Sequence, residues 1–76
     1  MSDPVLLDTK DMKCPLPVLK ARKALKDVAP GGILRVLATD PGAMKDFEHF
    51  CKTTGCRLID CRESDGVLIF DLAKPE

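Results

Sequence analysis

The sequence predicts an α/β (α+β) two-layer sandwich in the order β-α-β-α-β-β, with a mixed four-stranded sheet and two helices on one face. Two segments repeat apolar residues at helical spacing, and short apolar runs precede, separate and follow them. The last two runs are joined by a short turn, which predicts an antiparallel hairpin. Two helices can cover only one side of four strands. The order of the strands in the sheet does not follow from the sequence.

Length and composition limit the class of protein. Seventy-six residues predict a single domain, residues 1–76, and a hydrophobic fraction of 45% argues against disorder. Twelve basic and twelve acidic residues cancel, so direct nucleic-acid binding is not expected. Apolar runs fall far short of the roughly 20 residues of a membrane helix, and no secretory signal is visible. We therefore expect a cytoplasmic protein with reduced thiols and no membrane contact.

The first half of the chain predicts a strand, a helix and a second strand. Residues 4–9 are rich in Val and Leu, and their nearly continuous apolar run is typical of a parallel or central strand. A polar loop leads to a helix over residues 15–28, which residues 29–32 end with Pro and Gly. Its apolar stripe is Val18, Ala21, Leu25 and Val28. Residues 33–38 form the second strand.

The second half predicts a helix and a hairpin. Asp40 is expected as the helix N-cap, with Pro41 at the first helical position and Gly55 as the C-cap. The apolar positions between them are Ala43, Phe47, Phe50, Cys51 and Thr54. Residues 57–62 form a strand, residues 63–66 a hairpin turn, and residues 67–72 the last strand. Residues 73–76 are predicted to fray.

The stretch Cys14-Pro15-Leu16-Pro17 lies where the first helix begins. Pro is favoured at the first helical position because its missing N–H would have no partner there. Pro15 and Pro17 leave Leu16 and Val18 as N–H donors of the first turn. A thiolate at Cys14, at or next to the N-cap, would face these donors and the positive helix end, which can lower a thiol pKa by about one to several units. A reactive sulfur and an inert small apolar residue both remain open.

A family resemblance rests on this stretch and its surroundings. Cys-Pro-Leu-Pro after a strand ending in Leu-Asp, followed by PVLKARKAL and later by Ala-Thr-Asp-Pro-Gly-Ala, resembles the TusA-like (SirA-like) sulfur-carrier family. The match runs from about Val5 to Leu72. Family members usually have a Gly about two residues before the cysteine, whereas this chain has Thr9-Lys10-Asp11-Met12-Lys13.

The resemblance implies a function and partners. In that family the motif cysteine carries a persulfide between sulfur-handling proteins, and Cys14 matches that position. It implies sulfurtransferase-type activity without a cofactor. It also implies a donor (a cysteine desulfurase or another sulfurtransferase) and an acceptor protein, in tRNA thiolation, cofactor sulfuration or sulfur oxidation. The alternative is a protein- or RNA-binding regulatory module with a structural Cys14, although the scarcity of aromatics disfavours stacking on single-stranded RNA.

Five basic residues surround the motif and follow it along the helix. Such a run is usually a solvated helix face, and it could also dock an acidic partner near Cys14. The two roles are compatible. The set is Lys13, Lys20, Arg22, Lys23 and Lys26.

Three later cysteines are alternative sites for sulfur. Cys51 lies on an apolar stripe and is predicted to be in the core. Cys56 and Cys61 lie beside arginines, which could activate them if they are exposed. Together with His49 they suggest zinc, but the spacing lacks a Cys-x2-Cys pair, so no metal is expected. A redox pair of Cys14 with another cysteine is also disfavoured, because the chain has no Cys-x-x-Cys arrangement. We predict that sulfur loads on Cys14 alone.

Overall fold

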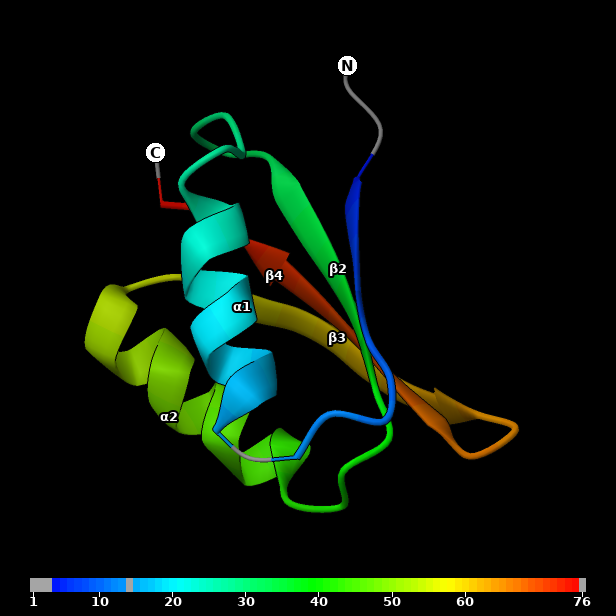
Figure 1. Ribbon diagram of the computed structural model, residues 1–76. Coiled ribbons are helices and arrows are strands. Elements are labelled where there is room, and N and C mark those ends of the chain that lie inside the picture. The colour runs from blue at the N-terminus through cyan, green and yellow to red at the C-terminus, as the bar shows by residue number, and fades with distance from the viewer. Residues whose placement is uncertain (1–3, 14, 76) are drawn as a thin grey trace.

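The computed structural model describes residues 4–13 and 15–75. The elements follow the predicted order: β1 (Val5–Thr9), α1 (Leu16–Leu25), β2 (Ile33–Ala38), α2 (Ala43–Thr54), β3 (Arg57–Ser64) and β4 (Val67–Ala73). Both helices lie on the same face of a four-stranded sheet (Figure 1). The predicted two-layer α+β sandwich is therefore confirmed.

The strand order in the sheet is β1-β2-β4-β3. β1 and β2 are parallel, β4 runs antiparallel to β2, and β3 runs antiparallel to β4. The apolar run of β1 correctly predicts a parallel strand, but β1 lies at an edge, and Leu6 is 63% exposed. The helices cover only one face, so alternate residues of β1 point away from the core.

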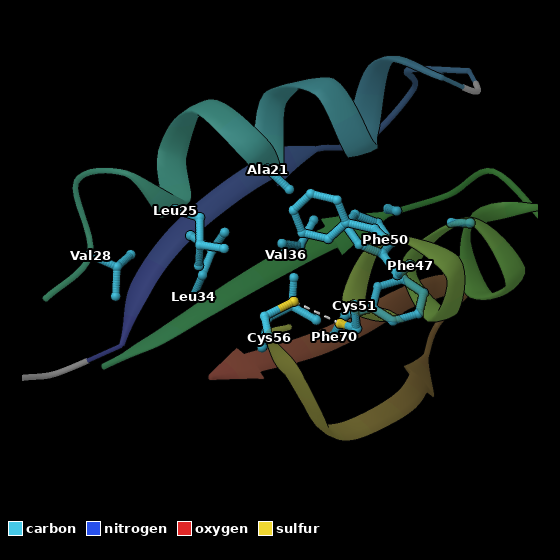
Figure 2. Close-up of a cluster of buried hydrophobic side chains, with 13 residues drawn as sticks. Ala21, Leu25, Val28, Leu34, Val36, Phe47, Phe50, Cys51, Cys56 and Phe70 are labelled. Carbon is cyan, nitrogen blue, oxygen red and sulfur yellow. Dashed lines mark hydrogen bonds between the residues drawn. The ribbon is translucent and has the colours of Figure 1, made fainter. Parts of the chain in front are cut away.

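The hydrophobic core lies between the helices and the sheet (Figure 2). With Trp and Tyr absent from the chain, three phenylalanines supply its largest side chains. The Phe47 ring lies 6.2 Å from the Phe50 ring, edge to face, and 4.8 Å from the Phe70 ring. Phe47 and Phe50 come from α2 and Phe70 from β4, so this cluster joins the two layers.

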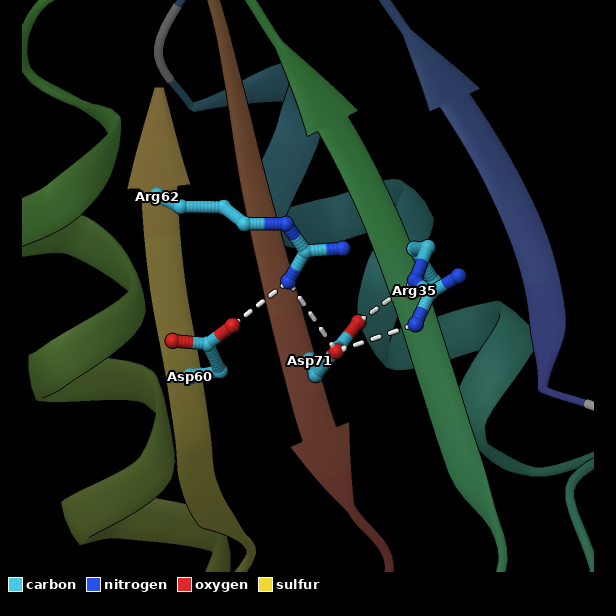
Figure 3. Close-up of polar contacts among 4 residues, drawn as sticks. All are labelled: Arg35, Asp60, Arg62 and Asp71. Atoms are coloured by element: carbon cyan, nitrogen blue, oxygen red, sulfur yellow. Dashed lines mark hydrogen bonds and ion pairs between the residues drawn. The ribbon is translucent and has the colours of Figure 1, made fainter. Parts of the chain in front are cut away.

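The other face of the sheet carries a charged network (Figure 3). Arg35 on β2 donates from Nε to Asp71 Oδ1 at 2.8 Å and from its terminal nitrogen to Oδ2 at 3.2 Å. Arg62 on β3 contacts Asp71 at 3.5 Å and also donates to Asp60. The hydrogen bonds from Arg35 lower the pKa of the Asp71 carboxyl below its ordinary value, although partial burial opposes them.

The predicted hairpin is confirmed, but β3 continues through Ser64, so the turn is shorter than the predicted residues 63–66. Asp65 and Gly66 both take positive φ, 51° and 81°, as a two-residue turn of type I′ requires. A bulge between Leu58 and Asp60 interrupts the pairing of β3 with β4. Ile59, within the bulge, is 55% exposed.

The ends of both helices differ from the prediction. α1 ends at Leu25, and the next three N–H groups bond to carbonyls three residues back, as far as Val28. Val28 is nevertheless buried, as its place in the apolar stripe predicted. α2 begins at Ala43 with Gly42 as its N-cap, so the predictions of Asp40 as the N-cap and of Pro41 at the first helical position are wrong. Asp40 instead forms the preceding turn, accepting at its backbone oxygen from the Ala43 N–H at 3.0 Å.

The predicted C-cap of α2 is confirmed, and the predicted frayed tail is wrong at its start. Gly55 is left-handed (φ 79°), and its N–H donates to the Cys51 carbonyl. β4 continues through Ala73. The Lys74 N–H donates to the Gly32 carbonyl at 2.9 Å, and Lys74 Nζ donates to the Val28 carbonyl at 2.7 Å. These bonds tie the end of β4 to the segment after α1.

Candidate functional site

A hollow of about 440 Å³ lies at the carboxyl ends of the two parallel strands. Because β1 and β2 run in the same direction, the loops that follow them meet beyond the same end of the sheet (Figure 1). Open α/β sheets commonly bind ligands beyond the carboxyl ends of their strands. The lining residues are Asp11, Met12 and Lys13 from the loop after β1, and Thr39, Asp40 and Pro41 from the loop after β2.

Hydrogen bonds hold the two loops together. Thr9, the last residue of β1, is fully buried, and its hydroxyl donates to the Leu37 carbonyl of β2. Two residues later, the Asp11 N–H donates to Thr39 Oγ1 at 2.9 Å. The Met12 N–H closes the turn by donating to the Thr9 carbonyl at 3.2 Å. The segment that leads to the motif is therefore fixed against the end of β2.

Asp11 takes a left-handed backbone conformation, with φ 66°. Most side chains avoid this region, whereas Gly occupies it freely and Asp tolerates it better than most residues. This explains how the loop turns without the Gly that the family resemblance leads one to expect near this point. Asp11 supplies the required conformation.

The two prolines lie at the start of α1. Pro15 is the exposed N-cap and Pro17, at the second helical position, is buried. The Leu16 N–H donates to the Lys13 carbonyl at 2.9 Å. The prediction that Leu16 offers a free donor to the sulfur is therefore wrong, because the tight turn at Lys13 uses it. Cys14 lies outside the described residues, so its own surroundings stay a prediction.

The predicted basic residues are all exposed. Lys13 lines the hollow, Lys20, Arg22 and Lys23 project from α1, and Lys26 is the C-cap of that helix. The same helix also exposes Leu16 and Leu19, at 46% and 54%. The sequence pattern did not lead us to expect these two leucines at the surface. Both leucines fall outside the apolar stripe of α1, and this position is the signal that could have identified them as exposed.

The second wall of the hollow, Thr39 to Pro41, was also missed as part of the site. The sequence pattern predicts this segment only as the start of a helix. The segment belongs to the site because it follows β2, which lies parallel and next to β1. Recognising this requires the strand order, which the sequence pattern does not give.

The three later cysteines differ in burial. Cys51 is buried, as predicted, and this burial raises its thiol pKa to about 12. Cys56 is also buried, whereas Cys61 is half-buried. Burial, followed by the charges of Asp60 and Glu48, raises the pKa of Cys61. The alternative in which a neighbouring arginine activates an exposed Cys61 is not supported, since Arg62 pairs with carboxylates on the other face of the sheet.

The residues that the structure describes form neither a metal-binding cluster nor a membrane-spanning helix. Within 4–13 and 15–75, no three His, Cys, Asp or Glu side chains come close enough together to hold a metal ion. Neither helix of the described chain is long and apolar enough to cross a membrane.

Comparison with known proteins gives a family model, two relatives and a solved structure that resemble this chain. The family model described as Sulfurtransferase TusA matches residues 5–74. A candidate sulfur carrier protein of Neisseria meningitidis serogroup A is 56% identical over 61 residues, covering 80% of this chain and 82% of that protein. The sulfur carrier protein TusA of Allochromatium vinosum is 44% identical over 68 residues, 90% of each chain. A crystal structure of a SirA-like protein from Desulfitobacterium hafniense, 24% identical, shares the fold, with a TM-score of 0.82 over 95% of this chain and 99% of that one.

Proposed function

We propose that this protein, which belongs to the sulfurtransferase TusA family, carries sulfur as a persulfide on Cys14. Sulfur carrying is the function of the family, and it requires a donor protein and an acceptor protein. We place residues 1–76 in one sulfur-carrier domain, since the family match spans 5–74. For the donor we propose a cysteine desulfurase or another sulfurtransferase.

The proposed relay has two steps. The Cys14 thiolate attacks the terminal sulfur of a donor persulfide. A new S–S bond forms, the donor S–S bond breaks, and the donor cysteine leaves as a thiolate. An acceptor thiolate then attacks the terminal sulfur on Cys14, and the Cys14 thiolate leaves. The sulfur keeps its oxidation state in both steps, so the relay consumes no electrons and no cofactor.

The observation that carries the assignment to Cys14 is the position of its two neighbours in the chain. Lys13 and Pro15 are both exposed, at the end of the loop that Thr39 fixes against β2. By contrast, the thiol pKa values of Cys51 and Cys61 are raised, which disfavours their nucleophilic thiolates.

The test is to locate the added sulfur. The protein is incubated with a low-molecular-weight persulfide and mapped by peptide mass spectrometry. We expect the wild type and Cys61→Ser to load one sulfur on Cys14, and Cys14→Ser to load none. Circular dichroism checks that each variant folds. Loading that persists in Cys14→Ser would refute the assignment. An unloaded, folded wild type would favour the regulatory module with a structural Cys14.

We further propose that the exposed face of α1 docks a partner protein. Lys20 and Lys23 lie one helical turn apart and alongside Leu16 and Leu19, so a cationic rim borders exposed apolar surface. This combination suits a partner that presents carboxylates around an apolar contact, because complementary charge speeds encounter and apolar burial retains it.

A charge-reversal experiment separates docking from chemistry. Lys20→Glu with Lys23→Glu should slow loading from a protein donor about tenfold at low salt, and much less at high salt. Loading from a low-molecular-weight persulfide should be unchanged. The matched control is Lys52→Glu, an exposed lysine in the last turn of α2. Equal slowing by Lys52→Glu, or with the small persulfide, would refute docking on α1.

A further inference from the structure

Two buried cysteines lie together at the junction of α2 and β3. Cys51 belongs to the last turn of α2, and Cys56 follows the Gly55 cap. Their sulfur atoms are 2.9 Å apart, and the Cys56 thiol donates to the Cys51 sulfur (Figure 2). The reversal of the chain at Gly55, with φ 79°, brings the two side chains together.

This distance is close to that of a bond. A disulfide has sulfur atoms about 2.05 Å apart, so closing one here requires them to approach by about 0.9 Å. The surrounding contacts also hold the pair in place, since Thr54 Oγ1 lies 3.2 Å from the Cys56 sulfur and bonds to the Phe50 carbonyl at 2.7 Å. The two thiols are therefore preorganised toward each other.

We propose that Cys51 and Cys56 are a modification site, at which a low-molecular-weight disulfide oxidises the pair to an intramolecular disulfide. The external disulfide supplies the oxidising equivalents. The proposal does not depend on sulfur carrying by Cys14, because the pair lies at the C-terminal end of α2 and the hollow at its N-terminal end.

The exchange proceeds in two balanced steps. The Cys56 thiolate attacks one sulfur of the external disulfide, forming a mixed disulfide and releasing one small thiolate. The Cys51 thiolate then attacks the Cys56 sulfur of that mixed disulfide, forming the internal bond and releasing the second small thiolate. The two cysteine protons pass through the solvent to the two released thiolates. The pair is oxidised by two electrons, and the external disulfide is reduced to two thiols.

Burial sets the order and the rate of these steps. Burial, reinforced by the neighbouring Cys56, raises the thiol pKa of Cys51 to about 12, which disfavours Cys51 as the first nucleophile. Cys51 and Cys56 are 8% and 5% exposed, so the reagent reaches them when the end of α2 opens locally. The flanking residues Lys52, Thr53, Gly55 and Arg57 are exposed, which leaves this end open to solvent on one side.

The test uses a variant that keeps only this pair of cysteines, Cys14→Ser with Cys61→Ser. It is incubated with oxidised glutathione, alkylated in denaturant and digested with trypsin. Cleavage after Lys52 separates the two cysteines, so a disulfide between them joins peptides 46–52 and 53–57. We expect the joined pair as the main product, with loss of two hydrogen atoms and separation on reduction. The matched control, with Cys56→Ser added, should give no joined pair.

Two outcomes would overturn the proposal. One is a pair that stays fully alkylatable after prolonged incubation, including in mild urea that increases local opening. The other is a product in which each cysteine holds its own glutathione. The wild-type protein is mapped in parallel, so that a folding defect of the variant cannot decide the result. Absence of joined 46–52 and 53–57 peptides from the wild type would also count against the pair.

Discussion

The left-handed conformation of Asp11 should be the most sensitive point of the loop that leads to Cys14. Asp11 has φ 66°, and its N–H is held by Thr39 at 2.9 Å, so the loop cannot easily adopt another conformation. A β-branched residue fits this region poorly. We expect Asp11→Val to cost about 1–2 kcal/mol of unfolding free energy. Asp11→Gly should be nearly neutral, because relief of the backbone strain offsets a loss of about 0.5–1 kcal/mol in chain entropy.

The expected loss is large for a domain of this size. A chain of 76 residues has a total stability of about 4–11 kcal/mol, and each kcal/mol shifts the Tm by about 4–8 °C. Urea unfolding followed by circular dichroism measures the free energies of wild type, Asp11→Val and Asp11→Gly. Sulfur uptake on Cys14 is measured in parallel and should be slowed in Asp11→Val only. Equal stability and equal uptake in all three proteins would refute the argument.

Three further predictions follow from the core, the charged network and the thiols. Phe47→Ala, which removes a fully buried ring, should cost about 3–5 kcal/mol in urea unfolding. A loss below about 1 kcal/mol would contradict the packing of Phe47 against Phe50 and Phe70. The pKa of Asp71 is lowered in the folded protein, so its stabilising effect is present above the unfolded pKa and is lost as the pH falls through the folded pKa. In thermal unfolding, the Tm of wild type should therefore fall more than the Tm of Asp71→Asn when the pH is lowered from 7 to below the ordinary carboxyl pKa of about 3.9. Parallel falls of the two Tm values would contradict this. Iodoacetamide should modify Cys14 at lower pH than Cys61, whose thiol pKa is raised by burial. If Cys61 reacts first by peptide mass spectrometry, the proposed reactivity of the motif is wrong.

Much of the fold follows from local pattern. The helical spacing of Ala43, Phe47 and Phe50 predicts α2 and its buried face, because that spacing places all three on one side of a helix. The turn at Asp65 and Gly66 predicts the hairpin, because those residue types tolerate positive φ. The sequence pattern predicts the ends of helices and strands less accurately than their positions. Asp is a residue type favoured at N-caps, yet Asp40 lies in the turn before α2, where its backbone carbonyl accepts a hydrogen bond.

The candidate site likewise has features that are visible in the sequence and contacts that form only in the folded chain. The family, the motif around Cys14 and the basic residues along α1 can be identified from the sequence, because these depend on which residue types stand at which spacing. Three contacts become visible only in the folded chain: the loop after β1 meets the loop after β2, Thr39 binds Asp11, and Cys51 meets Cys56. Local spacing does not encode which strands become neighbours or how far a chain reversal carries a side chain. Those contacts are settled when the helices and the sheet bury their apolar faces against each other.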